Sequence, residues 1–169
     1  MELSAIAVVD KNWGIGRDGG LLIHLPGDLK YFKEKTLDNI VIMGRATLES
    51  LPGGRPLPGR TTIIMTSNKK LQGDFYTVSS VDELFELIDK LTSETPDMIP
   101  YVSGGASVYE QLMPYTNTCL ITKIDNTFDA QKFFPNLDED DEFQMTSEGD
   151  TNSENGVDYK FTEYKRVKK

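Results

Sequence analysis

The sequence predicts a mixed α/β fold with a mostly parallel central sheet, flanked by helices, that ends in an antiparallel hairpin. Short, nearly continuous apolar runs at 3–10 and 39–43 indicate the parallel part, because such runs are typical of strands covered on both faces. Two later strand-like segments, 142–149 and 157–165, are joined by a polar loop that ends in an Asn-Gly pair at 155–156. This pattern predicts the closing hairpin.

The other expected elements alternate along the chain. Strands are expected at 61–65, 74–78, 99–103 and 119–125, and helices from Pro26, from Gly44 through Ser50, after Ser80 and at 108–113. Pro26 suits a first helical position, where a missing N–H costs nothing. Ser80 and Glu83 form a capping box before an amphipathic run. Because Pro100 has no N–H, we expect the strand at 99–103 to begin only after it.

Length and composition exclude several classes of protein. A chain of 169 residues suits one domain, and its net charge of −9 argues against a general nucleic-acid binder, whose affinity comes from Lys and Arg on phosphates. A single cysteine, Cys119, within an apolar run predicts an inert buried thiol and suits a reducing cytoplasm. One His and one Cys exclude a structural zinc site. The N-terminus predicts neither a signal peptide nor a membrane span.

Asp28 is the candidate functional acid. It falls in the first turn of the helix expected from Pro26, and Phe32 lies one turn further on the same face. A carboxylate on the inner edge of an apolar face is costly to bury unless a partner with hydrogen-bond donors lies against it. The alternative is an acid open to water and stabilised by the helix dipole, by about 0.3–1 kcal/mol. The helix segment alone leaves both interpretations open.

Two strand-to-helix junctions carry glycine, at 44–47 (Gly-Arg-Ala-Thr) and 104–107 (Gly-Gly-Ala-Ser). Glycine lets backbone N–H groups approach an anion at a helix start. One junction is weak evidence, but two favour an elongated ligand that bears phosphate. Their spacing does not match the G-x-G-x-x-G fingerprint. The segment 11–25, with four glycines, is expected to form a loop that covers a site. The acidic run 138–142 is interpreted as a solvated loop, with no metal assigned.

Five separated motifs together resemble the dihydrofolate reductase family across nearly the whole chain. They are VVDKNWGIG at 8–16, LPGDLKYF at 25–32, VIMGRATLESL at 41–51, RPLPGR at 55–60 and GGASVYEQLMP at 104–114, followed by LITKID. Their order and spacing carry the resemblance, which no single motif does. It implies a single domain over 1–169, with residues 40–93 approximately as an adenosine-binding subdomain, in a cytoplasmic monomer.

For the substrate, the resemblance implies that Asp28 accepts hydrogen bonds from N3 and the 2-amino group of a pteridine ring. Thr122 would support this carboxylate, and the expected catalytic residues are Asp28, Thr122 and Leu21. Arg60 matches an arginine that pairs bidentately with the α-carboxylate of the glutamate tail; the alternative is a solvated loop arginine. Ser103 ends the strand whose carbonyl faces the pteridine amino group. The pocket lining is expected to be Ile6, Val8, Leu21, Leu29, Phe32, Leu51 and Leu57.

For the cofactor, the resemblance implies NADPH. The nicotinamide half would contact Ala7, Ile15, Gly16, Arg17, Asp18, Gly19, Gly20 and Leu21. The pyrophosphate would lie on the two junctions, at Gly44, Arg45, Ala46, Thr47, Gly104, Gly105, Ala106, Ser107, Val108 and Tyr109. The bond between the two glycines of the second junction is cis in the family. Arg45 and Ser67 match residues near the adenosine 2′-phosphate, and the cofactor set is completed by Thr66, Asn68 and Ser103.

Three sites depart from the family pattern. Ser103 stands where a branched aliphatic residue is common, which leaves the role of its carbonyl intact but changes the packing. Leu22-Ile23 stand where a Pro-Trp pair is frequent, and isoleucine lacks the indole N–H that helps hold an ordered water. Ser107 stands where some members carry a second phosphate-binding arginine. A preference for NADPH over NADH would therefore rest on Arg45, Ser67 and Lys69.

The implied activity is reduction of 7,8-dihydrofolate to tetrahydrofolate by NADPH, which supplies one-carbon metabolism and thymidylate synthesis. Antifolate inhibitors are the other expected ligands. Three alternatives stay open. The chain could be a reductase for another pterin or a related nucleotide-pathway substrate, or a pterin- or nucleotide-binding protein without catalysis. The third is an acidic interaction module built on 138–142, which would leave both glycine junctions unexplained.

Overall fold

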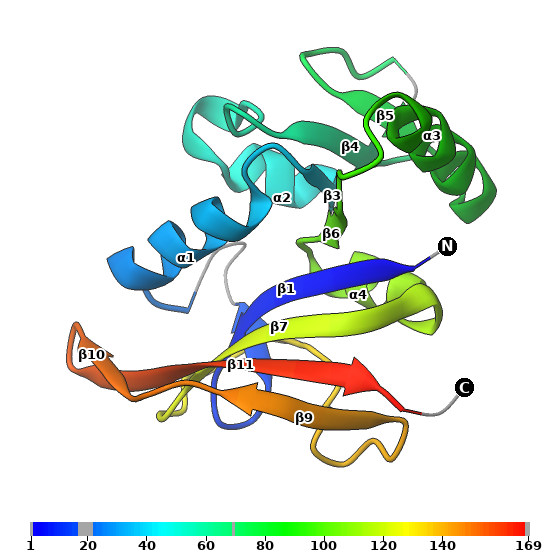
Figure 1. Ribbon diagram of the computed structural model, residues 1–169. Coiled ribbons are helices and arrows are strands. Elements are labelled where there is room, and N and C mark those ends of the chain that lie inside the picture. The colour runs from blue at the N-terminus through cyan, green and yellow to red at the C-terminus, as the bar shows by residue number, and fades with distance from the viewer. Residues whose placement is uncertain (1, 17–21, 69, 168–169) are drawn as a thin grey trace.

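A computed structural model describes residues 2–16, 22–68 and 70–167 (Figure 1). Across these residues runs a nine-stranded sheet in the order β10-β11-β7-β1-β6-β3-β4-β5, with β9 also paired to β11. Its strands are β1 (Leu3–Val9), β3 (Ile40–Gly44), β4 (Thr61–Met65), β5 (Tyr76–Val78), β6 (Pro100–Val102), β7 (Thr116–Ile124), β9 (Phe143–Glu148), β10 (Asn152–Glu154) and β11 (Val157–Arg166). Neighbours from β7 to β5 pair in parallel, whereas β11 pairs antiparallel with β7, β9 and β10. The predicted mixed, mostly parallel sheet is confirmed.

The helices cover both faces of this sheet. They are α1 (Pro26–Thr36), α2 (Arg45–Ser50), α3 (Val81–Glu94) and α4 (Ala106–Leu112), with short 3₁₀ turns η1 (Pro52–Gly54) and η2 (Met113–Tyr115). Pro26 begins α1 as expected, and the Ser80 hydroxyl accepts a hydrogen bond from the Glu83 amide at 3.1 Å to cap α3. None of the described helices is long and apolar enough to cross a membrane.

The packing of β3 explains why its sequence is apolar throughout. Successive side chains of a strand point to opposite faces. Ile40 and Ile42 pack in the core cluster that contains residues of α3 and α4, whereas Val41 and Met43 pack in a cluster with Leu48 of α2. Both faces of the strand are therefore buried. Cys119 is a buried free thiol, as predicted.

Three short strands and one boundary differ from expectation. Within the segment 11–25, expected as a loop, Gly14–Gly16 forms β2, which pairs with β8 (Lys132–Phe133). The Asn-Gly pair turns the chain between β10 and β11, not between the two longer strands, and its φ angles of 49° and 79° suit a two-residue hairpin. β6 begins at Pro100, where the expectation of a later start is wrong. Proline is tolerated there because it is the first residue of the strand.

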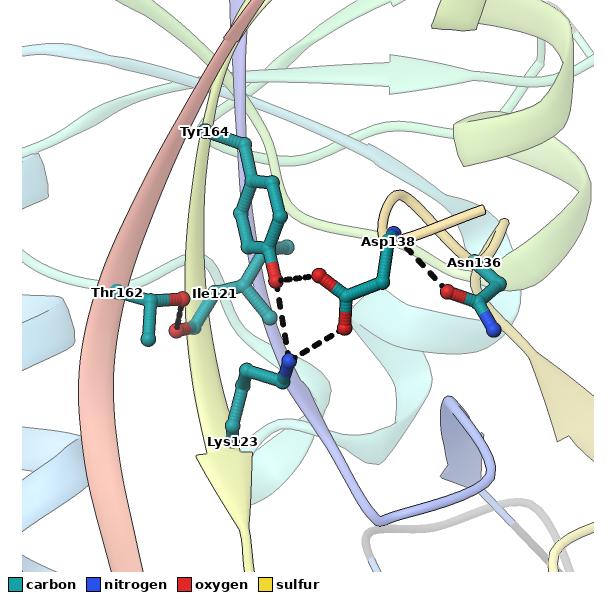
Figure 2. A network of polar contacts seen from close by, with 6 residues as sticks. All are labelled: Ile121, Lys123, Asn136, Asp138, Thr162 and Tyr164. Atoms are coloured by element: carbon teal, nitrogen blue, oxygen red, sulfur yellow. Dashed lines mark hydrogen bonds and ion pairs between the residues drawn. The ribbon is translucent and has the colours of Figure 1, made fainter. Parts of the chain in front are cut away.

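A polar network anchors the loop before β9 to the sheet (Figure 2). Lys123 Nζ lies 2.6 Å from Asp138 Oδ2 and 3.0 Å from the Tyr164 hydroxyl, which donates to Asp138 Oδ1 at 2.6 Å. Although burial raises it, these hydrogen bonds bring the pKa of Asp138 below its ordinary value. The same ammonium group lies 5.2 Å from the ring centroid of Trp13. Asp138, expected in a solvated loop, therefore joins that loop to β7 and β11.

We expect Tyr164→Phe to lower the free energy of unfolding by about 1–3 kcal/mol, because the phenol donates to a charged carboxylate. Chemical denaturation at neutral pH measures the change. The control is Tyr76→Phe, since Tyr76 is 47% exposed, and its effect should stay within about 0.5 kcal/mol. Equal effects of the two substitutions would contradict a stabilising role for the network.

Candidate active site

The two glycine junctions lie side by side at one edge of the sheet. β3 and β6 are parallel neighbours, so their carboxyl ends meet there, and the Gly44 amide donates to the Gly104 carbonyl at 2.9 Å. A Cβ on Gly105 would lie 3.6 Å from Thr47 Oγ1, and one on Gly44 would lie 3.2 Å from Val108 Cγ2. The Gly104–Gly105 peptide bond is cis, as the resemblance implies. The amino ends of α2 and α4 therefore open onto a shared region.

The remaining expected phosphate residues follow the next strand along the same edge. β4 is the parallel neighbour of β3, and Thr66, Ser67 and Asn68 come directly after it. Thr66 Oγ1 accepts a hydrogen bond from the Asn68 amide at 3.1 Å, and Ser67 is exposed. Arg45, also exposed, has its Nε 3.1 Å from Glu49 Oε1. Exposed ion pairs of this kind contribute little, about 0.3–0.5 kcal/mol, so an incoming phosphate can compete for the guanidinium group.

Asp28 is buried, with 9% of its surface exposed, in the first turn of α1. The Thr122 hydroxyl, itself buried on β7, donates to Asp28 Oδ1 at 2.7 Å. Burial raises the pKa of Asp28 to about 6, the Thr122 hydrogen bond lowers it and the negative charge of Glu154 raises it further. The structure therefore favours a buried functional acid over an acid that is open to water. The carboxyl group is therefore mostly ionised at pH 7, where roughly a tenth of it is protonated.

A small apolar cavity of about 20 Å³ lies against this carboxyl group. Its lining is Val8, Ile15, Leu22, Ile23, Leu25, Asp28, Leu29 and Ile124. Sequence reasoning missed Leu25 and Ile124. A signal for Ile124 existed, because it lies two residues after Thr122 on the same strand and therefore on the same face.

The lining of this cavity does not include four other residues that were expected there, Ile6, Phe32, Leu51 and Leu57. Phe32 packs against the clusters that contain Ile6 and Leu48, and Leu51 joins the latter cluster. Leu57 is half-buried in the loop after η1. Ala7 is buried on β1, and Ser103 Oγ donates to the Ile42 carbonyl at 3.3 Å. Six expected residues, Arg17, Asp18, Gly19, Gly20, Leu21 and Lys69, lie outside the described part of the chain.

Arg60 lies near the opposite end of α1 from Asp28. Its Nε and Nη2 donate to the Pro58 carbonyl at 3.0 and 2.6 Å, and its Nη1 lies 3.5 Å from Thr36 Oγ1. Partial burial lowers its pKa, although arginine stays charged. The eight residue steps from Asp28 to Thr36 span about 12 Å of helix axis at 1.5 Å per step. This helix therefore separates an acid from a cation, as a ligand with a basic ring and an anionic tail requires.

Fold and site define an α/β ligand-binding protein that has both a buried acid with a raised pKa and a pair of adjoining glycine turns. A family model described as dihydrofolate reductase matches residues 2–166. The dihydrofolate reductase of Bacillus subtilis (strain 168) is 38% identical over 165 residues, which are 97% of this chain and 94% of that protein. The Enterococcus faecium enzyme is 35% identical, covering 95% and 94% of the two chains. The structure of dihydrofolate reductase from Enterococcus faecalis complexed with NADP(H) and RAB-propyl has a TM-score of 0.84 at 34% identity, covering 99% of this chain and 97% of that one. The chain belongs to the dihydrofolate reductase family.

The raised pKa of Asp28 predicts a pH-dependent stability. In the unfolded chain this acid ionises near 3.8, and in the folded protein near 6. Its contribution to stability is therefore full below about pH 4 and is lost as the pH rises through about 6. We expect ligand-free Asp28→Asn to gain stability relative to the wild type by up to about 3 kcal/mol between about pH 4 and pH 8.

Chemical denaturation at a series of pH values measures this difference. Asp97→Asn, at an exposed position, is the matched control and should differ from the wild type by a constant amount. A difference between Asp28→Asn and the wild type that does not change with pH would contradict the assignment.

Proposed function

We propose that this protein catalyses the NADPH-dependent reduction of 7,8-dihydrofolate to 5,6,7,8-tetrahydrofolate, supplying one-carbon metabolism and thymidylate synthesis. One observation carries the proposal: in a chain of the dihydrofolate reductase family, the carboxyl group of Asp28 is buried, has a raised pKa and accepts a hydrogen bond from Thr122 at 2.7 Å. A pteridine ring offers the N–H donors that such a carboxyl group needs. Antifolate inhibitors with the same donors would bind there.

When bound, NADPH supplies a hydride from C4 of its nicotinamide, which C6 of the pteridine accepts while N5 takes a proton from water. Asp28 accepts hydrogen bonds from N3 and the 2-amino group, which orients the ring and favours its N5-protonated form. Thr122 occupies Oδ1, which directs the other oxygen to the ring. Apolar neighbours around the cavity exclude water, so the electrostatic influence of the carboxyl group is stronger there than in bulk water.

The two glycine junctions are proposed to hold the cofactor pyrophosphate. The hydrogen bond between Gly44 and Gly104 fixes the junctions relative to each other, so that both sets of backbone N–H groups reach one ligand. Arg45 and Ser67 are proposed at the 2′-phosphate, which would explain a preference for NADPH. Ala7 and the glycine-rich segment after β1 are proposed at the nicotinamide half, where closure of that segment would exclude water.

Leu22 and Ile23 replace the family's frequent Pro-Trp pair and line the cavity. Neither side chain can donate a hydrogen bond. The support of Asp28 is therefore proposed to rest on Thr122 rather than on a water held by an indole. The Leu22-Ile23 pair therefore changes the lining of the cavity, whereas the acid Asp28 is retained.

The chain is further proposed to act as a single-domain monomer in the cytoplasm, without a nucleic-acid partner. Residues 40–93 are proposed as an adenosine-binding subdomain. In support of this division, β3, β4, β5 and α3 form one end of the sheet in an unbroken stretch of sequence (Figure 1).

We expect Asp28→Asn to lower kcat/KM for dihydrofolate by at least about 100-fold, because a neutral amide cannot favour N5 protonation. The affinity for NADPH should change by less than about threefold, since the junctions lie on other elements. NADPH consumption followed by absorbance, with fluorescence titration of the cofactor, measures both. Unchanged turnover in this variant would contradict the role of Asp28, and binding without turnover in the wild type would support the non-catalytic alternative.

We expect Arg60→Lys to raise KM for dihydrofolate by about 10- to 100-fold, because the planar fork that matches a carboxylate is lost with the charge retained. A pterin without a glutamate tail should be reduced equally by variant and wild type. Arg55→Lys, an exposed arginine in the same loop, is the matched control and should leave both substrates unaffected. Equal loss with both substrates would place Arg60 in a structural role instead.

A further inference from the structure

The β10–β11 hairpin contacts the first turn of α1, where Asp28 lies. Glu154 Oε1, at the end of β10, accepts a hydrogen bond from the Gly27 amide at 2.8 Å and another from the Tyr159 hydroxyl at 2.6 Å. In the turn of the hairpin, Asn155 Nδ2 donates to the His24 carbonyl. The proposed function gives no role to these contacts, which join segments more than 120 residues apart in sequence.

Helix α1 has no capping side chain of its own. The position before its first turn is Leu25, and no side-chain hydrogen bond caps the helix from there. The first N–H groups of a helix have no partner within the helix and need an acceptor. Glu154 supplies one from another strand, and its negative charge suits the positive end of the helix dipole. The carboxylate thus takes the place of a capping residue.

Gly27 shows how closely the hairpin and the helix approach each other. A Cβ at this position would overlap the Tyr159 hydroxyl and lie 2.7 Å from Glu154 Oε1. A larger residue at position 27 would therefore have to displace the ends of these two side chains.

Glu154 also brings a second acidic group close to Asp28. Thr122 on β7 donates a hydrogen bond to Asp28. The other groups that interact with it electrostatically are Glu154 on β10, Tyr31 on α1, Tyr109 on α4 and Tyr159 on β11. Burial raises the pKa of Tyr31 and Tyr159 to about 12, and that of Tyr109 further, so these tyrosines are neutral near pH 7. Among these groups, Glu154 is the one whose negative charge raises the pKa of Asp28.

We propose that Glu154 is a positioning residue for the reduction: bound to Gly27 and Tyr159, it fixes the first turn of α1 against the hairpin and sets both the place of the Asp28 carboxyl group and the charge which that group faces. The proposal rests on the function proposed above. It assigns to the β10–β11 hairpin an action on the acid of the site, although the hairpin itself lies outside the cavity lining.

Glu154→Gln separates the charge from the hydrogen bonds. Its amide oxygen can still accept from Gly27 and Tyr159, while the negative charge is gone. Removing that charge makes ionisation of Asp28 easier. We therefore expect the midpoint of the pH profile of kcat/KM for dihydrofolate to move to lower pH by about 0.5 unit or more. The affinity for NADPH and the melting temperature at pH 7 should stay close to those of the wild type.

The matched control is Glu139→Gln, which removes an exposed carboxylate in the loop before β9 and should leave the midpoint unchanged. Carbon NMR titration of the Asp28 carboxyl group in the ligand-free protein should show the same downward shift in Glu154→Gln. A fully folded Glu154→Gln protein with an unshifted midpoint and an unshifted NMR titration would overturn the proposal. A wild type that does not reduce dihydrofolate would instead overturn the proposed function.

Gly27→Ala tests the positioning without changing any charge. Alanine ordinarily stabilises a helix relative to glycine, by about 1 kcal/mol, but here its methyl group would displace Glu154 and Tyr159. We expect a lower melting temperature and a lower kcat/KM for dihydrofolate, with NADPH affinity retained. A Gly27→Ala protein as stable and as active as the wild type would show that the hairpin does not fix the helix.

Discussion

The burial of one carboxyl group in the first turn of α1 is the constraint on which the site depends. Asp28 is tolerated among apolar side chains because the Thr122 hydroxyl donates to one of its oxygens. Burial still makes its ionised form costly, which raises its pKa to about 6. This buried acid lowers the stability of the ligand-free protein. A ligand that brings its own N–H donors removes the cost, so the same feature that destabilises the empty site favours occupancy.

The parallel sheet brings the rest of the site to this acid. β7 and β3 both lie close to the centre of the strand order, with β1 and β6 between them. β7, on one side of β1 in the strand order, carries Thr122, which donates a hydrogen bond to Asp28 of α1. β6 and β3, on the other side of β1, end in the two glycine turns, which are joined by a hydrogen bond. Elements distant in sequence thus contribute to a single edge, where parallel strands end together.

The sequence predicted those parts whose signals are local. The apolar run of β3 reveals a strand buried on both faces, and Ser80 with Glu83 marks the start of α3. The three-residue strands β2 and β10 are too short for a periodic signal, and their partners are set by tertiary contacts. Glu154 could not be found for the same reason, because its partner Gly27 lies 127 residues away. The cofactor residues came from the family resemblance, since glycine spacing alone permits several ligands.

The position of β11 has a consequence for synthesis of the protein. This last strand lies between β7 and the pair β9 and β10, and Arg166 at its end donates to the backbone carbonyls of Met113 and Thr116. The sheet is therefore incomplete until β11, up to Arg166, has left the ribosome. A nascent chain that stalls before residue 157 exposes the long edge of β7, a template for intermolecular pairing. Chaperone binding to that edge is thus most valuable before β11 has emerged.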